Sequence, residues 1–398
     1  MPQKLTFSVI GELNPELQQL LKEFEQISHI KLDLVHMTWE DAWAKLLSYA
    51  LQGGGPDISH VGSTWVSSLV TMNTVREFSP REVETIGGSQ AFTAPAWQSA
   101  TLQDDPRIWS IPWSSFTFLM LYRRDHLKNA RINESHAFET PEALAETVHK
   151  LRASGSHSPI MLPSGKPFLD RVHIASSWVW AAGGTYISDD GKQPMLNTSQ
   201  TRAGLKSFFE LYRLMSPGDL GLSYEETLER FRAGEVSVVI ADCGYPATLV
   251  QEGPQRSEVI GVHSLPGVPF VSGDNLVIWQ ATRQYPEKER LALKLVSFLV
   301  SRSAQSHLSQ SMEQFPVRHD ALQALDCEIE QLVPTLQKTF ETGRAHKAIH
   351  LWSRYERELG YTFDEITRDV LARSSLPVDA ILETYLTQLQ HRFSLLMG

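Results

Sequence analysis

The first sixty residues alternate between strand-like and helix-like patterns, and this alternation restricts the fold more than any other feature of the chain. Residues 5–10, 30–37 and 58–61 have the apolar patterns of strands. Two helical segments lie between them, and each begins after a capping residue, Asn14 or Thr38. Strand, helix, strand, helix and strand at this spacing predict parallel strands joined by right-handed crossovers.

Three loops of this segment follow a strand and precede a helix, so we expect them to share one edge of the sheet. They contain Glu12, Trp39 and the run Ser63-Thr64-Trp65. Ligands of open α/β sheets lie outside the carboxyl ends of the strands. Small polar groups beside a tryptophan suit a polar ligand with apolar faces. Taken one by one, a loop carboxylate is usually just solvated and a large aromatic is usually mostly buried. The convergence of three loops favours a binding site.

A second α/β pattern begins after Trp113. Residues 116–122 and 236–241 have the apolar runs of buried strands. The second run is followed by a polar and aromatic loop that contains Asp242 and Tyr245. This loop is again at the carboxyl end of a strand, where a ligand is expected.

The rest of the chain supplies further candidates. Asp274 and Asn275 precede another short strand, and the chain from about residue 321 is almost wholly helical. Trp178 and Trp180 lie near the end of one helix, where two residues at this spacing point to different faces. One of them is therefore a core residue, and we favour Trp180 for a ligand site.

The composition argues against several classes of function. A formal net charge of −10 argues against a nucleic-acid partner, whose phosphates need a basic surface. The chain has no apolar run of about 18 residues, so no membrane span is expected. Cys243 and Cys327 form no Cys-x-x-Cys motif, and the histidines lack metal-binding spacing. We expect no metal and no cofactor, and two ordinary buried thiols, although a disulfide between them stays open.

Several short motifs follow one another along the chain. They are Gly55-Pro56-Asp57-Ile58 with Trp65, Ile111-Pro112-Trp113 followed by 121–125, 180–184 followed by 190–192, 231–245, 273–278, and Pro316-Val317-Arg318. In this order they resemble the family-1 extracellular solute-binding proteins of ABC importers, the relatives of maltose-binding protein. Each motif is loose, but the series covers nearly the whole chain.

The resemblance implies an α/β fold of the two-lobed periplasmic-binding-protein kind (type II). Each lobe would hold a mainly parallel sheet flanked by helices, and the C-terminal tail would be helical. The implied boundaries are 1–112 with 273–316 for the first lobe, and 113–272 with 317–398 for the second. Crossovers are expected near 111–118, 268–275 and 314–319.

The resemblance also implies binding residues. Carried over by position, they are Ser63, Thr64 and Trp65 in the first lobe, Trp113 and Phe116 near the first crossover, and Phe168, Tyr245 and Trp352 in the second lobe. A sugar has an apolar face for flat aromatics and a rim of hydroxyls for planar polar groups. As polar groups that could bind these hydroxyls, we add Glu12, Asp242, Asp274 and Asn275 to the expected binding residues.

The expected function is therefore binding of a carbohydrate, in particular an oligosaccharide, in the cleft between the lobes, with delivery to an ABC import permease. The resemblance implies a monomer outside the cytoplasm, held there through a removed signal or lipid anchor. Residues 1–13 themselves show no signal-peptide pattern. Two alternatives stay open. One is a ligand-sensing domain of a signalling protein. The other is a glycoside hydrolase that uses Asp242 and Asp274 as carboxylates about 5–10 Å apart.

Overall fold

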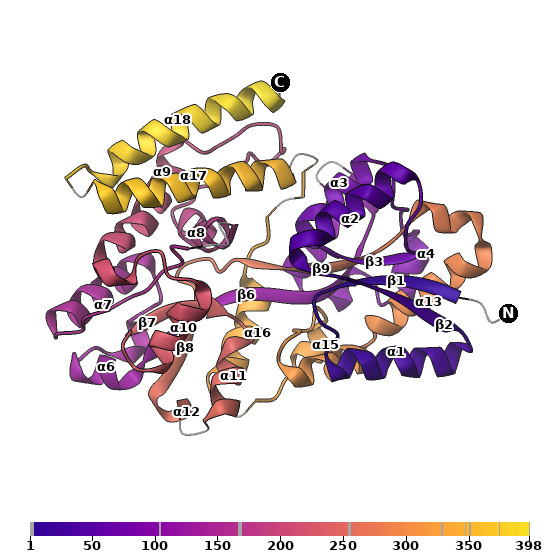
Figure 1. Cartoon of the computed structure of the whole chain (residues 1–398), viewed down its shortest axis with the longest axis horizontal. Coiled ribbons are helices and arrows are strands. Elements are labelled where there is room, and N and C mark those ends of the chain that lie inside the picture. Colours follow the sequence, from indigo (N-terminus) through magenta and orange to yellow (C-terminus); the bar gives the residue numbers. More distant parts are fainter. Residues whose placement is uncertain are drawn as a thin grey trace. The chain divides into compact units, whose positions relative to one another are not determined.

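The computed structural model describes residues 4–102, 105–165, 169–253, 256–327, 329–346, 348–349, 352–373 and 375–397 (Figure 1). The chain forms two compact units. Unit 1 comprises Met1–Phe116, Val271–Asp326 and Ala345–Ser353. Unit 2 comprises Thr117–Phe270, Cys327–Arg344 and Arg354–Gly398. Each unit is thus assembled from three separate stretches of the sequence.

The bounds of these two units differ from the lobe boundaries that the resemblance implies. Residues 113–116, 271–272, 317–326 and 345–353 lie in unit 1, although the first lobe was expected to lack them. Hydrogen bonds within unit 1 explain the difference. The amide of Ser115 donates to the carbonyl of Phe315 (2.8 Å) and the amide of Thr93 to that of Val317 (2.8 Å). The hydroxyl of Ser353 lies 3.1 Å from that of Ser68.

The sheet of unit 1 has the strand order β2-β1-β3-β9. β1 (Lys4–Ile10) pairs in parallel with both β2 (Lys31–Met37) and β3 (Ile58–Gly62). β9 (Val271–Ile278) pairs antiparallel with β3, in a register that places Asp274 opposite Gly62. The parallel strands predicted for the first sixty residues are confirmed, and a strand from much later in the chain completes the sheet.

The helices between these strands begin at the predicted capping residues. α1 (Pro15–Ser28) starts after Asn14, whose Oδ1 accepts from the amide of Leu17 at 2.9 Å. α2 (Trp39–Gln52) starts after Thr38, which forms a reciprocal capping box with Asp41. A capped start fixes where the first helical residue lies. In α2 that residue is Trp39, which is therefore held at the sheet edge.

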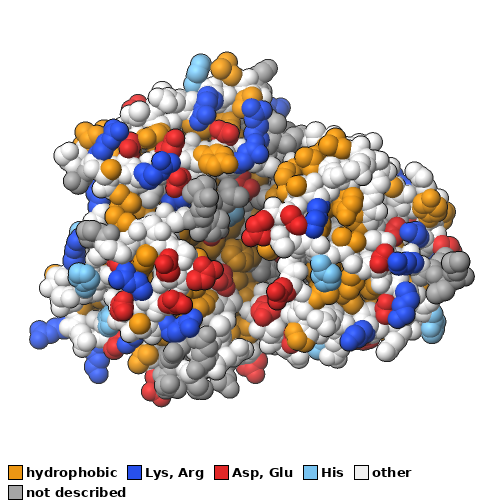
Figure 2. All heavy atoms as spheres, in the orientation of Figure 1, with side chains coloured by type: hydrophobic (Ala, Val, Ile, Leu, Met, Phe, Trp, Pro, Cys, Tyr) orange, Lys and Arg blue, Asp and Glu red, His pale blue; other side chains and the backbone are white. Residues whose placement is uncertain are grey.

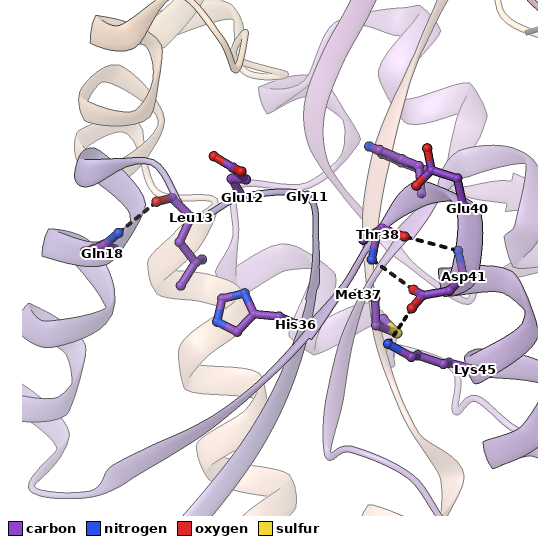
Figure 3. A pocket seen from close by; sticks show the side chains of 11 residues that line it. Gly11, Glu12, Leu13, Gln18, His36, Met37, Thr38, Glu40, Asp41 and Lys45 are labelled. Atoms are coloured by element: carbon purple, nitrogen blue, oxygen red, sulfur yellow. Dashed lines mark hydrogen bonds and ion pairs between the residues drawn. The ribbon is translucent and has the colours of Figure 1, made fainter. Parts of the chain in front are cut away.

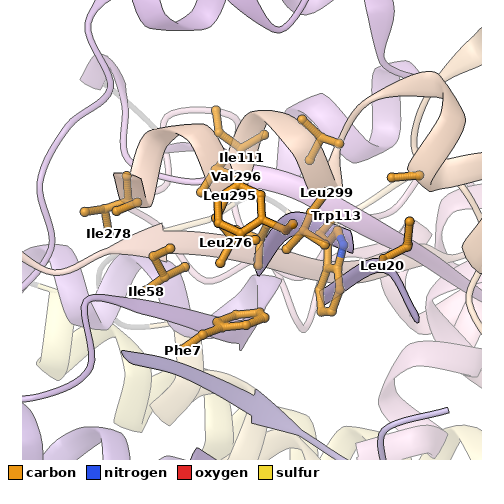
Figure 4. Close-up of a cluster of buried hydrophobic side chains, with 14 of the residues drawn as sticks. Phe7, Leu20, Ile58, Ile111, Trp113, Leu276, Ile278, Leu295, Val296 and Leu299 are labelled. Carbon is orange, nitrogen blue, oxygen red and sulfur yellow. The ribbon is translucent and has the colours of Figure 1, made fainter. Parts of the chain in front are cut away.

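Apolar side chains cover both faces of the sheet because successive residues of a strand point to opposite faces. On one face, Phe7, Ile58 and Leu276 pack with residues of α1 and of α13 (Pro286–Leu299) (Figure 4). On the other face, Val61 packs with residues of α2 and of α3 (Val66–Thr71). The other elements of unit 1 are α4 (Pro80–Thr85), α5 (Ala94–Ser99), β4 (Thr101–Leu102), β5 (Asp105–Ile108), α14 (Arg302–Leu308) and α15 (His319–Leu322).

Unit 2 is built on the second half of β6 (Ile111–Arg123). This half pairs antiparallel with β7 (Val238–Asp242) on one edge and with β8 (Ile260–Ser264) on the other. Parallel pairing occurs in single bridges, Ser158 with Val236 and Met161 with Val239. The fold is two α/β units with mixed sheets, but the expectation of a mainly parallel second sheet is wrong. An apolar run predicts a buried strand and carries no information about its direction.

Helices surround this sheet and form the tail of the chain, as expected. α8 (Leu169–Ala181) ends before Gly183, whose φ of 75° lies in the left-handed region that favours glycine. α10 (Tyr224–Arg232) starts after Ser223, which forms a capping box with Glu226. The remaining helices are α6 (Arg124–Asn129), α7 (Pro141–Ala153), α9 (Ser199–Glu210), α11 (Tyr245–Glu252), α12 (Arg256–Val259), α16 (Leu332–Thr342), α17 (Trp352–Ala372) and α18 (Val378–Met397).

Acidic and basic side chains are interspersed on the face shown in Figure 2. Within the described ranges, no helix is long and apolar enough to cross a membrane. Those ranges also hold no group of three or more His, Cys, Asp or Glu side chains arranged to bind a metal ion. Both cysteines are free: Cys243 is buried, and Cys327 is half-buried.

Candidate functional site

The predicted loops of unit 1 do meet at one edge of its sheet. The loop after β1 and the start of α2 line a cavity of about 670 Å³ (Figure 3). Glu12 and His36 lie on one side of it, and Glu40 and Lys45 lie on the other. Trp39 also lines the cavity. The prediction that Glu12 and Trp39 converge is thus in agreement with the geometry of the cavity.

Three tryptophans form a row beside this cavity. The ring of Trp39 lies 5.6 Å from that of Trp65 at an interplanar angle of 65°, and Trp65 lies 5.6 Å from Trp43 at 49°. Trp65 is half-buried, whereas 48% of the surface of Trp39 is exposed. An aromatic ring that is supported on one side and exposed on the other offers a rigid apolar face to a ligand.

Asp274 lies at the same edge of the sheet. Its Oδ2 accepts a hydrogen bond from the hydroxyl of Ser114 (2.8 Å) and lies 3.2 Å from Nε2 of His60. The side chain of Asp274 is 19% exposed, so the carboxylate reaches the surface of unit 1. A carboxylate held in this way is a hydrogen-bond acceptor for hydroxyl donors.

The small polar residues after β3 are engaged within unit 1. The hydroxyl of Ser63 lies 3.1 Å from that of Ser272, and the carbonyl of Thr64 accepts from the hydroxyl of Ser353 at 3.3 Å. Ser63 is buried and Thr64 is half-buried. These contacts fix the 3-10 turn Ser63–Trp65 and thereby the position of Trp65.

Two of the predicted binding residues belong to the interior of unit 1. Asn275 is fully buried, and its side-chain amide donates to the carbonyl of Ser99 (3.1 Å) and to the hydroxyl of Ser110 (2.9 Å). Its Oδ1 accepts from the hydroxyl of Ser99 at 3.2 Å. Trp113 is 1% exposed and packs in the core against Phe7, with ring centroids 6.2 Å apart. Both side chains are committed to packing within unit 1, which argues against a role for them in binding the ligand.

Trp352 also belongs to unit 1, and not to the second lobe as expected. Its ring lies 4.4 Å from that of His346, and its amide donates to the carbonyl of Ile349 at 3.0 Å. Phe116 is half-buried and is the last residue of the first stretch of unit 1. Phe168 lies outside the described residues.

In unit 2, both oxygens of Asp242 are engaged. Oδ1 accepts from the amides of Gly244 (2.9 Å) and Tyr245 (3.0 Å) at the start of α11, and Oδ2 accepts from the phenol of Tyr224 at 2.5 Å. Tyr245 is 8% exposed, and its hydroxyl lies 3.4 Å from the carbonyl of Leu228. Trp180 lies beside Phe270, and the guanidinium of Arg344 lies 5.0 Å from the centre of its ring.

Tyr224, which donates to Asp242, lines a small cavity of about 10 Å³. Asp170 and Ser223 line the same cavity. Burial, together with the charge of Asp242, raises the pKa of Asp170 from 3.8 to about 6, although His173 and Arg171 oppose the shift. Burial and the bonded carboxylate of Asp242 also raise the pKa of Tyr224. Sequence reasoning missed Asp170 because it sits within a helix with no distinctive motif.

Sequence reasoning also missed His60. It lies within the apolar run of β3 and is 2% exposed. Its neighbours in the structure are Asp274, Trp39 and Trp113. The one signal in the sequence is a histidine in a strand whose other residues are apolar or small.

The fold is that of sugar-binding proteins of known structure. The structure of the sugar-binding protein MalE from Xanthomonas citri superposes with a TM-score of 0.83, covering 98% of this chain and 97% of that one at 18% identity. The cyclic α-maltosyl-1,6-maltose binding protein of Arthrobacter globiformis gives 0.79, with 99% and 100% covered at 14% identity. Maltose-bound MalE3 of T. maritima gives 0.76, with 98% and 99% covered at 18% identity.

Sequence comparison gives the family directly. No curated protein sequence matches the chain. Residues 19–334 match the family model described as bacterial extracellular solute-binding protein. This range takes in the segments that carry Trp39, Trp65 and Asp274. The chain belongs to the family of bacterial extracellular solute-binding proteins.

Proposed function

We propose that this protein binds a neutral carbohydrate, in particular an oligosaccharide, and delivers it to the membrane permease of an ABC importer. The observation that carries the proposal is the exposed ring of Trp39, supported by Trp65, beside the carboxylates of Glu12 and Asp274. The ring suits the C–H face of a sugar, and the carboxylates suit its hydroxyls. A site with buried polar groups rejects a ligand that leaves them unpaired.

The relatives support the same class of ligand. The structures similar to this chain include a protein bound to maltose and another named for binding a cyclic maltosyl-maltose. We propose that the chain acts outside the cytoplasm, as the family description states, and as a monomer. We propose that its partner is a membrane permease that receives the sugar, and that it binds no nucleic acid.

We also propose that bound sugar is not turned over. A glycosidase needs one carboxyl group free to give a proton and another free to attack or to activate water. Asp242 accepts three hydrogen bonds within unit 2, which leaves it poorly placed for either role. Incubation with each bound sugar followed by chromatography should return the sugar unchanged.

The test of binding is calorimetric titration with maltose, maltotriose, a cyclic tetrasaccharide and a set of monosaccharides. We expect at least one neutral sugar to bind and to raise the melting temperature. A ligand at 100 times its Kd adds about 2.7 kcal/mol to the free energy of unfolding. Binding of amino acids or peptides, with no sugar bound at millimolar concentration, would contradict the proposal.

A further inference from the structure

We propose that His60 is a positioning residue of the ligand site, which holds the carboxylate of Asp274 in a fixed orientation and supports the ring of Trp39. The inference rests on the proposed function, since it assigns to Asp274 the role of accepting a ligand hydroxyl. It adds a buried histidine, which does not reach the ligand itself, to the residues that determine affinity.

The protonation of the imidazole follows from where β1 and β3 separate. The two strands pair at Phe7 with Ile58 and at Ser8 with Ser59, and the ladder goes no further. Beyond this ladder, the backbone amide of Ile10 donates to the side chain of His60, at Nδ1, over 3.1 Å. Nδ1 therefore acts as an acceptor, so the neutral ring carries its proton on Nε2.

Nε2 lies 3.2 Å from Oδ2 of Asp274, close enough for electrostatic attraction but without the alignment of a hydrogen bond. The hydroxyl of Ser114 donates to the same oxygen at 2.8 Å. Both interactions engage Oδ2, and among the described residues Oδ1 has no hydrogen-bond partner. A carboxylate with one oxygen held and one available selects ligand groups that donate, such as hydroxyls. Carboxylate or phosphate groups of a ligand would be repelled.

The ring of His60 also joins a buried tryptophan to the exposed one. Its centre lies 4.9 Å from that of Trp113 at 81° and 5.8 Å from that of Trp39 at 87°. Trp113 is fixed in the core, so the imidazole has a rigid support on one side. One buried side chain thus supports both the acceptor and the aromatic face of the proposed site.

Two amide substitutions separate the interactions of the imidazole. In His60→Asn the amide oxygen takes the place of Nδ1 and accepts from Ile10, but nothing replaces Nε2. In His60→Gln the amide nitrogen takes the place of Nε2 near Oδ2 of Asp274, but the acceptor for Ile10 is lost. Both variants lose the ring that supports Trp39, so the difference between them reports the positioning of Asp274: His60→Asn should bind the best neutral sugar at least about threefold more weakly than His60→Gln.

The Asp274→Asn background supplies the control: His60→Asn should weaken binding less there than in wild type, because the part of its effect that acts through Asp274 is already absent and only the loss of support for the Trp39 ring remains. Ser114→Ala, which removes the other donor and leaves the ring contacts intact, should weaken binding in the same sense. Equal affinity for wild type and His60→Asn, with both variants folded, overturns the proposal. So does an equal loss in His60→Asn and His60→Gln, since that would indicate a merely structural role.

A measurement without ligand keeps this inference distinct from the proposed function. Long-range proton–nitrogen NMR of histidine-labelled protein should show His60 as the tautomer with its proton on Nε2, and Asp274→Asn should shift that proton signal. A proton on Nδ1, or a signal unchanged by Asp274→Asn, overturns the inference whether or not a sugar binds. If no sugar binds but the NMR result is as expected, the sugar-binding proposal fails and the positioning of Asp274 stands.

Discussion

Replacement of Trp39 by alanine should reduce affinity for sugar far more than it reduces stability. Trp39 is 48% exposed, and its ring contacts are edge contacts with Trp65 and His60. Aromatic pairs of this kind contribute about 0.5–1.5 kcal/mol each, so loss of the two pairs should lower the free energy of unfolding by about 1–3 kcal/mol. Loss of an aromatic anchor from a binding site costs about 2 kcal/mol or more, which is about thirtyfold in Kd.

Trp113 provides the matched contrast, because it is the same residue type in the same unit with 1% exposure. Trp113→Ala should lower the free energy of unfolding by about 3–5 kcal/mol through loss of core packing. The assays are thermal or urea melts without sugar and calorimetric titration with the best neutral sugar, for wild type and both variants.

The reasoning about Trp39 is refuted by the reverse pattern. If Trp39→Ala leaves Kd within twofold of wild type while it melts as low as Trp113→Ala, the exposed ring is a packing residue. The row Trp39, Trp65 and Trp43 would then be an exposed extension of the core, and the ligand of unit 1 would have to be sought elsewhere on its surface.

Two further predictions concern residues that sequence analysis misassigned or missed. Asn275→Ala leaves the hydroxyl of Ser110 and the carbonyl of Ser99 without their partner, so it should lower the free energy of unfolding by about 1–3 kcal/mol. Kd for sugar should stay within threefold, and a loss of binding in a stable variant would show that Asn275 serves the ligand. Because the pKa of Asp170 is raised from 3.8 to about 6, the folded state holds its proton more tightly than the unfolded state does. The contribution of Asp170 to the free energy of unfolding is therefore fully present below about pH 4 and is lost as the pH rises through 6. Asp170→Asn should remove this loss of stability, which is at most about 3 kcal/mol and smaller where water reaches the carboxyl. The measurement is urea denaturation of wild type and variant at several pH values. A wild-type free energy of unfolding that does not change between pH 4 and 7 would count against the prediction.

The parallel part of unit 1 was predictable because local signals agree there. Asn14 and Thr38 fix the helix starts, and the strand patterns leave one way to bury both faces of the sheet. The directions of β6, β7 and β8 were not predictable, because an apolar run has the same pattern in either direction. Trp352 was assigned to the wrong unit because a helical segment without sheet pairing carries no sign of the core that it joins.

The candidate site was predictable only in part. Position after a strand singled out Glu12 and Trp39, whereas Asp274 and Asn275 were chosen as polar groups for the hydroxyls of a sugar. The sequence could not separate Asp274 from Asn275, because neighbouring residues of a strand point to opposite faces and only one of these faces leads to the surface. His60 was missed because a histidine between Ser59 and Val61 in a short strand gives no sign that its ring reaches a carboxylate from another strand.

The assembly of unit 1 from three stretches of sequence has a consequence for its synthesis. Residues 1–116 emerge from the ribosome well before β9 and α13, which complete the sheet edge and one face of the core and follow more than 150 residues later. Until they arrive, β3 presents an unpaired edge, and unpaired edges invite pairing with other chains. Closing such distant contacts is slow. The nascent chain must therefore pass through a long period in which its first strands need protection from aggregation.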